Sequence, residues 1–182
     1  MKYLKKMLRV PQATANCFVL LETGILPIEY EIWKRQFTFL YHIINLDDDD
    51  PVRIMYLQMK TLAGEKNWAN NIHLFRNKFG IQVSDVEIRG MDIDRYKSHV
   101  RDCLRSFVFN ELKAECATKS KTKKLIYQTF GQQKYMTHLP PKHMYIFIKI
   151  RCGMLNTIHD RPYLYRADRC RVCGIDFEQQ TI

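Results

Sequence analysis

The sequence predicts an all-α fold, an irregular helical bundle that ends in a short basic C-terminal appendage. Apolar residues recur mostly at spacings of three and four, which is the period of an amphipathic helix. Only seven glycines and six prolines occur in 182 residues, so long helices are favoured over many turns. With 46% hydrophobic and 12% aromatic residues, the chain can bury a core. We expect six to eight helices within residues 1–158 and a basic linker at residues 159–182.

Local signals place the first helices. "QATANCFVLLETG" predicts a helix that stops at Gly24, a residue that readily adopts the left-handed conformation. Pro27 suits the first turn of the next helix, and Asp50 with Pro51 predicts the N-cap and first residue of a third. In the second of these helices one apolar stripe is formed by Ile28, Ile32, Phe39, Ile43 and Leu46, with Trp33 and Leu40 beside it.

Further along the chain, "NWANNIHLFRNKFG" predicts a shorter helix closed by Gly80. Ser84 and Glu87 have the spacing of a capping box. Residues 92–119 then read as one long helix. Its predicted inward residues are Tyr96, Val100, Leu104, Phe107, Val108 and Leu112.

The segment "KHMYIFIKIRCGMLNTIHD", residues 142–160, follows a short helix and a loop with two prolines. Its core "MYIFIKI" alternates and is β-branched, which would suit a strand. Because no partner strand is apparent elsewhere, we expect a buried helix here.

Positive charge is the main functional signal. The net charge is +10, which indicates an anionic partner, with nucleic acid first and an anionic membrane surface second. Lysines and arginines cluster at 113–134 and 142–171 with tyrosines between them, and these residue types neutralise phosphates and stack on unpaired bases. The alternative is a solvated face with core tyrosines. The predicted contacts to RNA and DNA are Lys121, Lys123, Lys124, Lys149, Arg151, Arg161, Arg166, Arg169 and Arg171.

Two of the six cysteines indicate half of a metal site. Cys170 and Cys173 stand in "CRVCG", a spacing typical of a zinc turn, but no Cys or His follows them to complete four ligands. Cys152 and His159 could join them, although that spacing matches no common finger. Four of the cysteines stand singly in apolar surroundings, as free thiols do inside cells. With no membrane-spanning run, we expect an intracellular, nuclear protein.

The sequence contains no motif that clearly indicates an enzyme. The run Asp47–Asp50 invites comparison with metal-binding aspartates of polymerases, but a helix cap is the simpler interpretation, since negative charge suits a helix N-terminus. The six histidines are scattered and match no nucleophile motif. We therefore expect no catalytic activity from this chain.

Two stretches resemble a known family. "LLETGILPIEYEIWKRQFTFLYHII" is similar to a segment of the reverse transcriptases of non-LTR retrotransposons that carry a restriction-like endonuclease. "YMTHLPPKHMYIFIKIRCGMLNTIHDR", followed by "RCRVCG", resembles the stretch downstream of it, which leads into a Cys-Cys-His-Cys knuckle.

This resemblance implies a helical thumb-and-linker region between a polymerase and an endonuclease, holding template RNA and target DNA. It also implies that Cys170 and Cys173 bind zinc only in a complete parent protein, so no cofactor is expected in this chain alone. An alternative is a freestanding, domesticated helical module that binds a protein, which an exposed apolar stripe along 27–46 or 92–112 would favour. A third is a small enzyme whose site assembles scattered His and Asp.

Overall fold

A computed structural model describes residues 1–62 and 66–152. These residues form nine α-helices and no strand, so the predicted all-α class is confirmed. The helices are α1 (Lys2–Met7), α2 (Asn16–Thr23), α3 (Ile28–Ile44), α4 (Pro51–Thr61), α5 (Trp68–Lys78), α6 (Asp85–Arg89), α7 (Ile93–Thr118), α8 (Tyr135–His138) and α9 (Pro141–Arg151).

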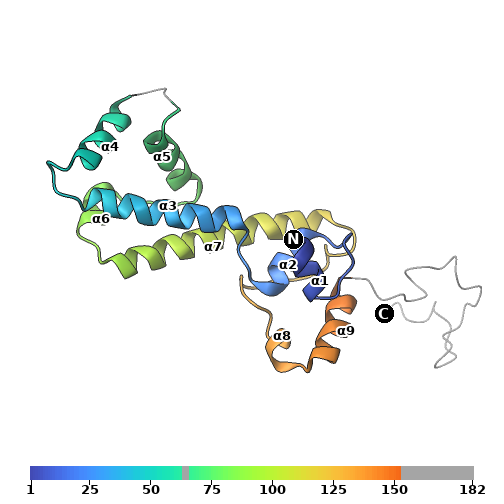
Figure 1. Cartoon of the computed structure of the whole chain (residues 1–182). Helices are drawn as coiled ribbons and strands as arrows, with labels where there is room; N and C mark the ends of the chain where they lie inside the picture. The colour runs from blue at the N-terminus through green and yellow to red at the C-terminus, as the bar shows by residue number, and fades with distance from the viewer. Residues whose placement is uncertain (63–65, 153–182) are drawn as a thin grey trace, which may run out of the picture.

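Helices α3 and α7 lie side by side in opposite directions and form the spine of an elongated molecule (Figure 1). Helices α4, α5 and α6 gather at one end of this spine, and α1, α2, α8 and α9 gather at the other. We call residues 28–118 the central hairpin. Residues 1–27 and 119–152, which come together from both ends of the described chain, form the terminal lobe.

The core face of α3 differs from the stripe seen in the sequence. Tyr30, Phe37 and Leu40 are buried, whereas Ile28, Ile32 and Phe39 are 77%, 50% and 54% exposed. The reason is a set of aromatic rings on α5 and α7 that packs against the Tyr30–Phe37 face of α3. In this set the rings of Trp33 and Phe75 stack with centroids 3.6 Å apart, and Phe79 contacts Phe37, Trp33, Tyr30 and Phe107.

The predicted core face of α7 is confirmed. Five of its six predicted residues are buried, and Phe107 is partly buried against the same core. Because this helix packs on α2 as well as on α3, its apolar stripe has to continue over its whole length.

The predicted helix ends are also confirmed. The Asp50 carboxylate accepts a hydrogen bond of 2.8 Å from the Val52 amide, and Pro51 is the first residue of α4. Ser84 and Glu87 make both hydrogen bonds of a capping box at the start of α6. Gly24 ends α2 with a φ of 65°.

The segment that could have been a strand is helix α9, so the expected helix is confirmed, but its expected burial is wrong. Ile148 is the one buried residue of α9, and Ile146 and Ile150 are 51% and 50% exposed. One helix was not predicted. Helix α1 spans six residues, which is too short for a periodic apolar pattern to identify it. Within the described residues, no helix is long and apolar enough to cross a bilayer. The expected boundary between residues 158 and 159 lies outside the described part of the chain.

Candidate nucleic-acid interface

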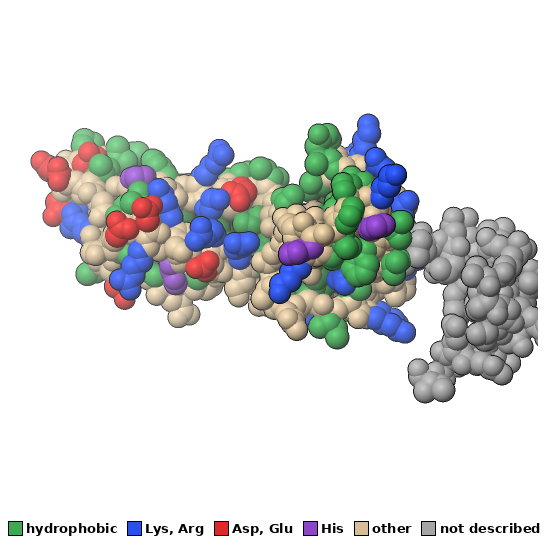
Figure 2. Space-filling view, turned by 90° about the horizontal axis from the view of Figure 1, so that it is seen from below, with side chains coloured by type: hydrophobic (Ala, Val, Ile, Leu, Met, Phe, Trp, Pro, Cys, Tyr) green, Lys and Arg blue, Asp and Glu red, His purple; other side chains and the backbone are tan. Residues whose placement is uncertain are grey.

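The charge of the described chain is divided unequally between its two regions. The terminal lobe contains twelve lysines and arginines and a single acidic residue, Glu22, for a net charge of +11. The central hairpin contains thirteen basic and fourteen acidic residues, for a net charge of −1. Figure 2 shows the result on one face: acidic side chains appear over the α4–α6 end and the middle, and the described part around α8 and α9 shows only basic ones.

Glu22 is at the centre of the terminal lobe, and its side chain is completely buried. Its Oε1 accepts hydrogen bonds of 2.6 Å from the Tyr127 hydroxyl and 2.9 Å from Nε of Arg151. Its Oε2 accepts a short hydrogen bond from the Tyr135 hydroxyl. A buried carboxylate is tolerated only when it is paired and hydrogen-bonded, and here three donors from two later segments satisfy it.

The chain around Glu22 is folded tightly enough to bring these donors together. The Gln133 amide donates a 3.0 Å hydrogen bond to the Glu22 carbonyl oxygen. A β-carbon on Gly24 would lie 2.5 Å from both the Gln132 nitrogen and the Gly131 carbonyl carbon. Only glycine allows the 131–133 backbone to approach so closely, and its positive φ adds to this requirement. The "LETG" sequence therefore provides both the buried acid and the gap that the returning chain fills.

The surroundings hold these side chains in one protonation state. Burial, followed by the charge of Glu22, raises the pKa of Tyr127. Burial and a hydrogen bond to Glu22 raise the pKa of Tyr135. Burial alone would lower the pKa of Arg151, but the charges and hydrogen bonds of Glu22 and Tyr127 together outweigh it and raise that pKa. The two phenols thus stay donors and the guanidinium stays charged at neutral pH.

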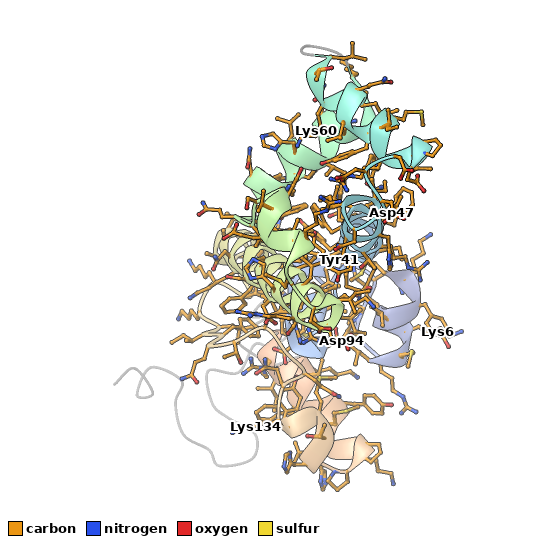
Figure 3. All side chains as sticks on the ribbon, turned by 90° about the vertical axis from the view of Figure 1, so that its left-hand side faces the viewer. Lys6, Tyr41, Asp47, Lys60, Asp94 and Lys134 are labelled. Carbon is orange, nitrogen blue, oxygen red and sulfur yellow. The ribbon has the colours of Figure 1, made fainter. Side chains whose placement is uncertain are left out.

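Neutralising Glu22 inside the lobe leaves the surface of these described segments cationic. The predicted contacts Lys121, Lys123 and Lys124 are exposed on the loop that follows α7, and Lys149 is half-buried on α9. Lys6 of α1 and Lys134 lie on different sides of the lobe (Figure 3). Basic residues therefore lie on more than one side of the lobe.

Arg151 occupies a different environment from these lysines. Besides its ion pair with Glu22, its guanidinium lies 5.5 Å and 5.7 Å from the ring centroids of Tyr127 and Tyr135. Its contact with phosphate stays a prediction, and the structure gives it a packing role that the sequence analysis missed. The sequence "FVLLETG" contains a signal for this role, because Glu22 directly follows an apolar run on a helix. An acidic side chain buried with such a run is almost always paired with a cation.

The interleaved tyrosines are mostly not arranged to stack on bases. Tyr127 is 2% exposed and belongs to the core. Tyr145, on α9, is half-buried, and the Arg9 guanidinium lies 4.5 Å from its ring centroid. Core packing, which was the alternative interpretation, therefore describes Tyr127 and Tyr135 better than base stacking does.

Several predicted residues lie outside the described part of the chain. These are Arg161, Arg166, Arg169 and Arg171, together with the half zinc site of Cys170 and Cys173 and its possible ligand His159. Cys152 is buried, and its thiol donates to the Lys149 carbonyl oxygen at 3.5 Å. Within residues 1–62 and 66–152, no three His, Cys, Asp or Glu side chains are grouped closely enough to hold a metal ion.

The acidic run at residues 47–50 lies at the N-terminus of helix α4. Asp50 caps α4, and the carboxylate of Asp48 pairs with Arg53 and Arg89. This supports the capping interpretation of the run over the polymerase one.

Comparisons with known proteins do not assign the chain to a family. No family model, no curated protein and no solved structure matches it.

Proposed function

We propose that this protein binds RNA and DNA through their phosphate backbones, using the cationic surface of the terminal lobe. The observation that carries the proposal is the net charge of +11 on a lobe whose single acid, Glu22, is buried against Arg151. With its one carboxylate withdrawn from the surface, the lobe presents only attractive charge to a phosphate chain.

Binding of this kind is electrostatic. Lysines that neutralise phosphates release condensed counterions, and this release supplies most of the sequence-independent affinity. Cations on several sides of a lobe favour a nucleic acid that wraps or bends around it over one that follows a straight groove. The proposed role is to position nucleic acid, and no bond-making step is assigned to this chain.

The resemblance described from the sequence suggests a biological setting for this role. In that setting the chain holds template RNA and target DNA between the polymerase and endonuclease regions of a non-LTR reverse transcriptase. Cys170 and Cys173 would then supply two of the four ligands of a zinc knuckle. This placement is part of the proposal and rests on the resembling motifs alone.

A second candidate is a freestanding helical module that binds another protein. The exposed stripe of Ile28, Ile32 and Phe39 on α3 favours it, because three large apolar side chains on one helix face remain accessible in the described structure. Nucleic-acid binding is the better supported function, because the charge asymmetry involves a whole lobe, whereas the stripe involves three residues.

Fluorescence anisotropy with a labelled RNA hairpin, measured at several salt concentrations, tests the proposal. The test variant replaces Lys121, Lys123 and Lys124 by alanine. The matched control replaces three exposed basic residues of the central hairpin, Arg35, Arg95 and Lys97, so that both variants lose the same charge.

We expect the test variant to bind more weakly. The magnitude of the slope of log K against log salt should fall by about 2 to 3, because each neutralised phosphate contributes about 0.7 to 0.9 to it. The control variant should keep both the slope and most of the affinity. Equal losses in the two variants would mean that only net charge matters. A salt-independent affinity in the wild type would overturn the proposal.

A further inference from the structure

A groove of about 850 Å³ lies where the central hairpin meets the terminal lobe. It runs between the first turn of α3 and the C-terminal half of α7, and the link from α2 to α3 forms one end. Apolar side chains line its floor, among them Leu20, Leu26, Val108 and Leu112. At its edge Ile25 and Ile28 are 45% and 77% exposed, so the apolar surface continues out of the groove.

The rim of this groove is acidic. Glu29 and Glu31 come from the first turn of α3, and Glu111 and Glu115 come from successive turns of α7. The described residues that line the groove include no lysine or arginine. All four glutamates belong to the central hairpin, whose net charge is −1, so the groove places a concentration of negative charge directly beside the cationic terminal lobe.

Three of the four rim carboxylates, those of Glu31, Glu111 and Glu115, make contacts that leave them on the surface. The Tyr30 hydroxyl donates a 2.5 Å hydrogen bond to Glu111, which ties α3 to α7 across the groove. Glu31 pairs with Lys34 at 2.5 Å, and Glu115 lies 4.0 Å from Lys119. Surface ion pairs of this kind contribute little to stability and are easily exchanged for a stronger one.

We infer that this groove binds a cationic amphipathic helix of a partner protein. Such a helix would lay leucine-like side chains on the apolar floor and direct lysines or arginines to the four rim glutamates. A helix that sets its apolar face into a hydrophobic groove is a recurrent mode of peptide recognition, and complementary charge at the rim selects the partner.

The sign of the rim distinguishes this site from the nucleic-acid surface. Four carboxylates repel a phosphate chain, so the groove and the cationic terminal lobe suit opposite partners. The inference does not depend on the proposed function, because it uses a different surface and a different kind of charge.

Two designed peptides provide the probes. One is a two-heptad helix of leucine and lysine, and the other has glutamate in place of every lysine, so that apolar pattern and length are the same. Binding of each fluorescently labelled peptide to the full chain is measured by anisotropy at low and high salt. Binding of the RNA hairpin is measured in separate samples without peptide, because a cationic peptide binds RNA directly.

Matched variants locate the site. Ile28→Ser removes an exposed apolar side chain at the groove edge, and Val86→Ser removes one that is 83% exposed in the first turn of α6, away from the groove. Glu29→Gln combined with Glu31→Gln removes rim charge at constant shape. Its control is Asp94→Asn combined with Asp102→Asn, two exposed acids of α7 outside the groove lining.

We expect the leucine–lysine peptide to bind and the leucine–glutamate peptide not to bind. Ile28→Ser should weaken binding about tenfold, as loss of an interface anchor does, and Val86→Ser should leave it unchanged. The glutamine pair should weaken binding several-fold at low salt and less at high salt. RNA binding should be the same in the wild type, in Ile28→Ser and in the glutamine pair.

Other results would overturn the inference. If neither peptide binds, or if both bind equally, the groove does not select a cationic helix. If the two serine variants lose the same affinity, the peptide binds elsewhere. If RNA affinity falls in the groove variants, the groove belongs to the nucleic-acid surface instead.

Discussion

The central hairpin and the terminal lobe are stabilised in different ways. In the hairpin, rings from α3, α5 and α7 contact one another at centroid distances from 3.6 to 6.3 Å, and opposite charges nearly balance. In the terminal lobe, one buried carboxylate accepts from two tyrosines and an arginine, and the remaining charge is positive.

The difference shows how a small folded unit can have a surface that carries only positive charge. Like charges repel, so a lobe of net charge +11 needs contacts that hold its segments together without placing acids on its surface. A single buried acid that joins α2, residues 127–135 and α9 provides those contacts. The hairpin, with balanced charge, combines aromatic packing with ion pairs such as those of Asp85 with Lys60 and Arg76.

The largest expected effect comes from Glu22→Ala. It would leave the Arg151 charge and two tyrosine hydroxyls without their acceptor, and breaking a buried pair in this way costs about 3–5 kcal/mol. Hydrogen exchange should then show loss of protection in residues 119–152, while residues 28–118 keep theirs.

The reciprocal variant Phe79→Ala serves as the control for Glu22→Ala. It removes the ring that contacts five other aromatic residues, at a similar cost of about 3–5 kcal/mol, and should lower protection in the hairpin first. Uniform loss of protection in both variants would mean that the two regions unfold as one unit.

The next effect in size is that of Gly24→Ala. A β-carbon here meets backbone atoms at 2.5 Å and forces an unfavourable positive φ, so we expect a loss of about 3 kcal/mol. Thermal unfolding monitored by circular dichroism measures it. Gly80→Ala is the matched control, because Gly80 also has a positive φ but no atom within 4 Å of its added β-carbon, so its loss should be about 1 kcal/mol.

A smaller effect, dependent on pH, is expected in the hairpin from Asp85→Asn. Asp85 pairs with Lys60 at 2.7 Å and with the buried Arg76 at 2.8 Å. Burial raises the pKa of Asp85, but the hydrogen bonds and charges of Lys60 and Arg76 outweigh it and hold that pKa below its usual value. We expect Asp85→Asn to cost about 2 kcal/mol at neutral pH.

The sign of the pH dependence follows from the lowered pKa of Asp85. Its contribution is complete above the unfolded pKa of about 3.9 and is lost as the pH falls through the folded value. Urea unfolding at neutral pH and at successively lower pH should therefore show the wild type and Asp85→Asn converging in acid. A constant difference at all pH values would contradict this account.

The smallest effect on stability is expected from replacing Lys121, Lys123 and Lys124 together by alanine. These side chains are exposed, so the free energy of unfolding should change by less than about 1 kcal/mol, while RNA affinity falls as described above. A large loss of stability would show that the loop also holds the lobe together, and its effect on binding would then have to be reinterpreted.

The parts of the fold that were predicted correctly depend on residues near one another in the chain. The Asp50 cap, the Ser84–Glu87 capping box and the stop at Gly24 each involve four residues or fewer. The core face of α7 repeats over many turns, so its pattern is unambiguous. The face of α3 was predicted only in part, because this helix carries apolar residues on two sides. Ile43 of the expected stripe and Leu40 beside it are buried, whereas the other side is exposed.

Less of the candidate site than of the fold could be predicted from the sequence. Exposed lysines at 121–124 follow from composition, since a run of lysines in a break between helices is bound to be solvated. The role of Arg151 could not be read in the same way, because its partner Glu22 is 129 residues away in the chain. Likewise, no local pattern places Glu29 and Glu31 opposite Glu111 and Glu115.

By itself the sequence determined several helix ends, such as those at Gly24, Asp50 and Ser84, and that the net charge is positive, because caps and composition are local or additive properties. Only the tertiary structure decided that the charge lies on one lobe, that Glu22 is hidden inside it, and that an acidic groove borders it. Those features arise where segments far apart in the chain meet, and burying a carboxylate is favourable only when all of its donors arrive together.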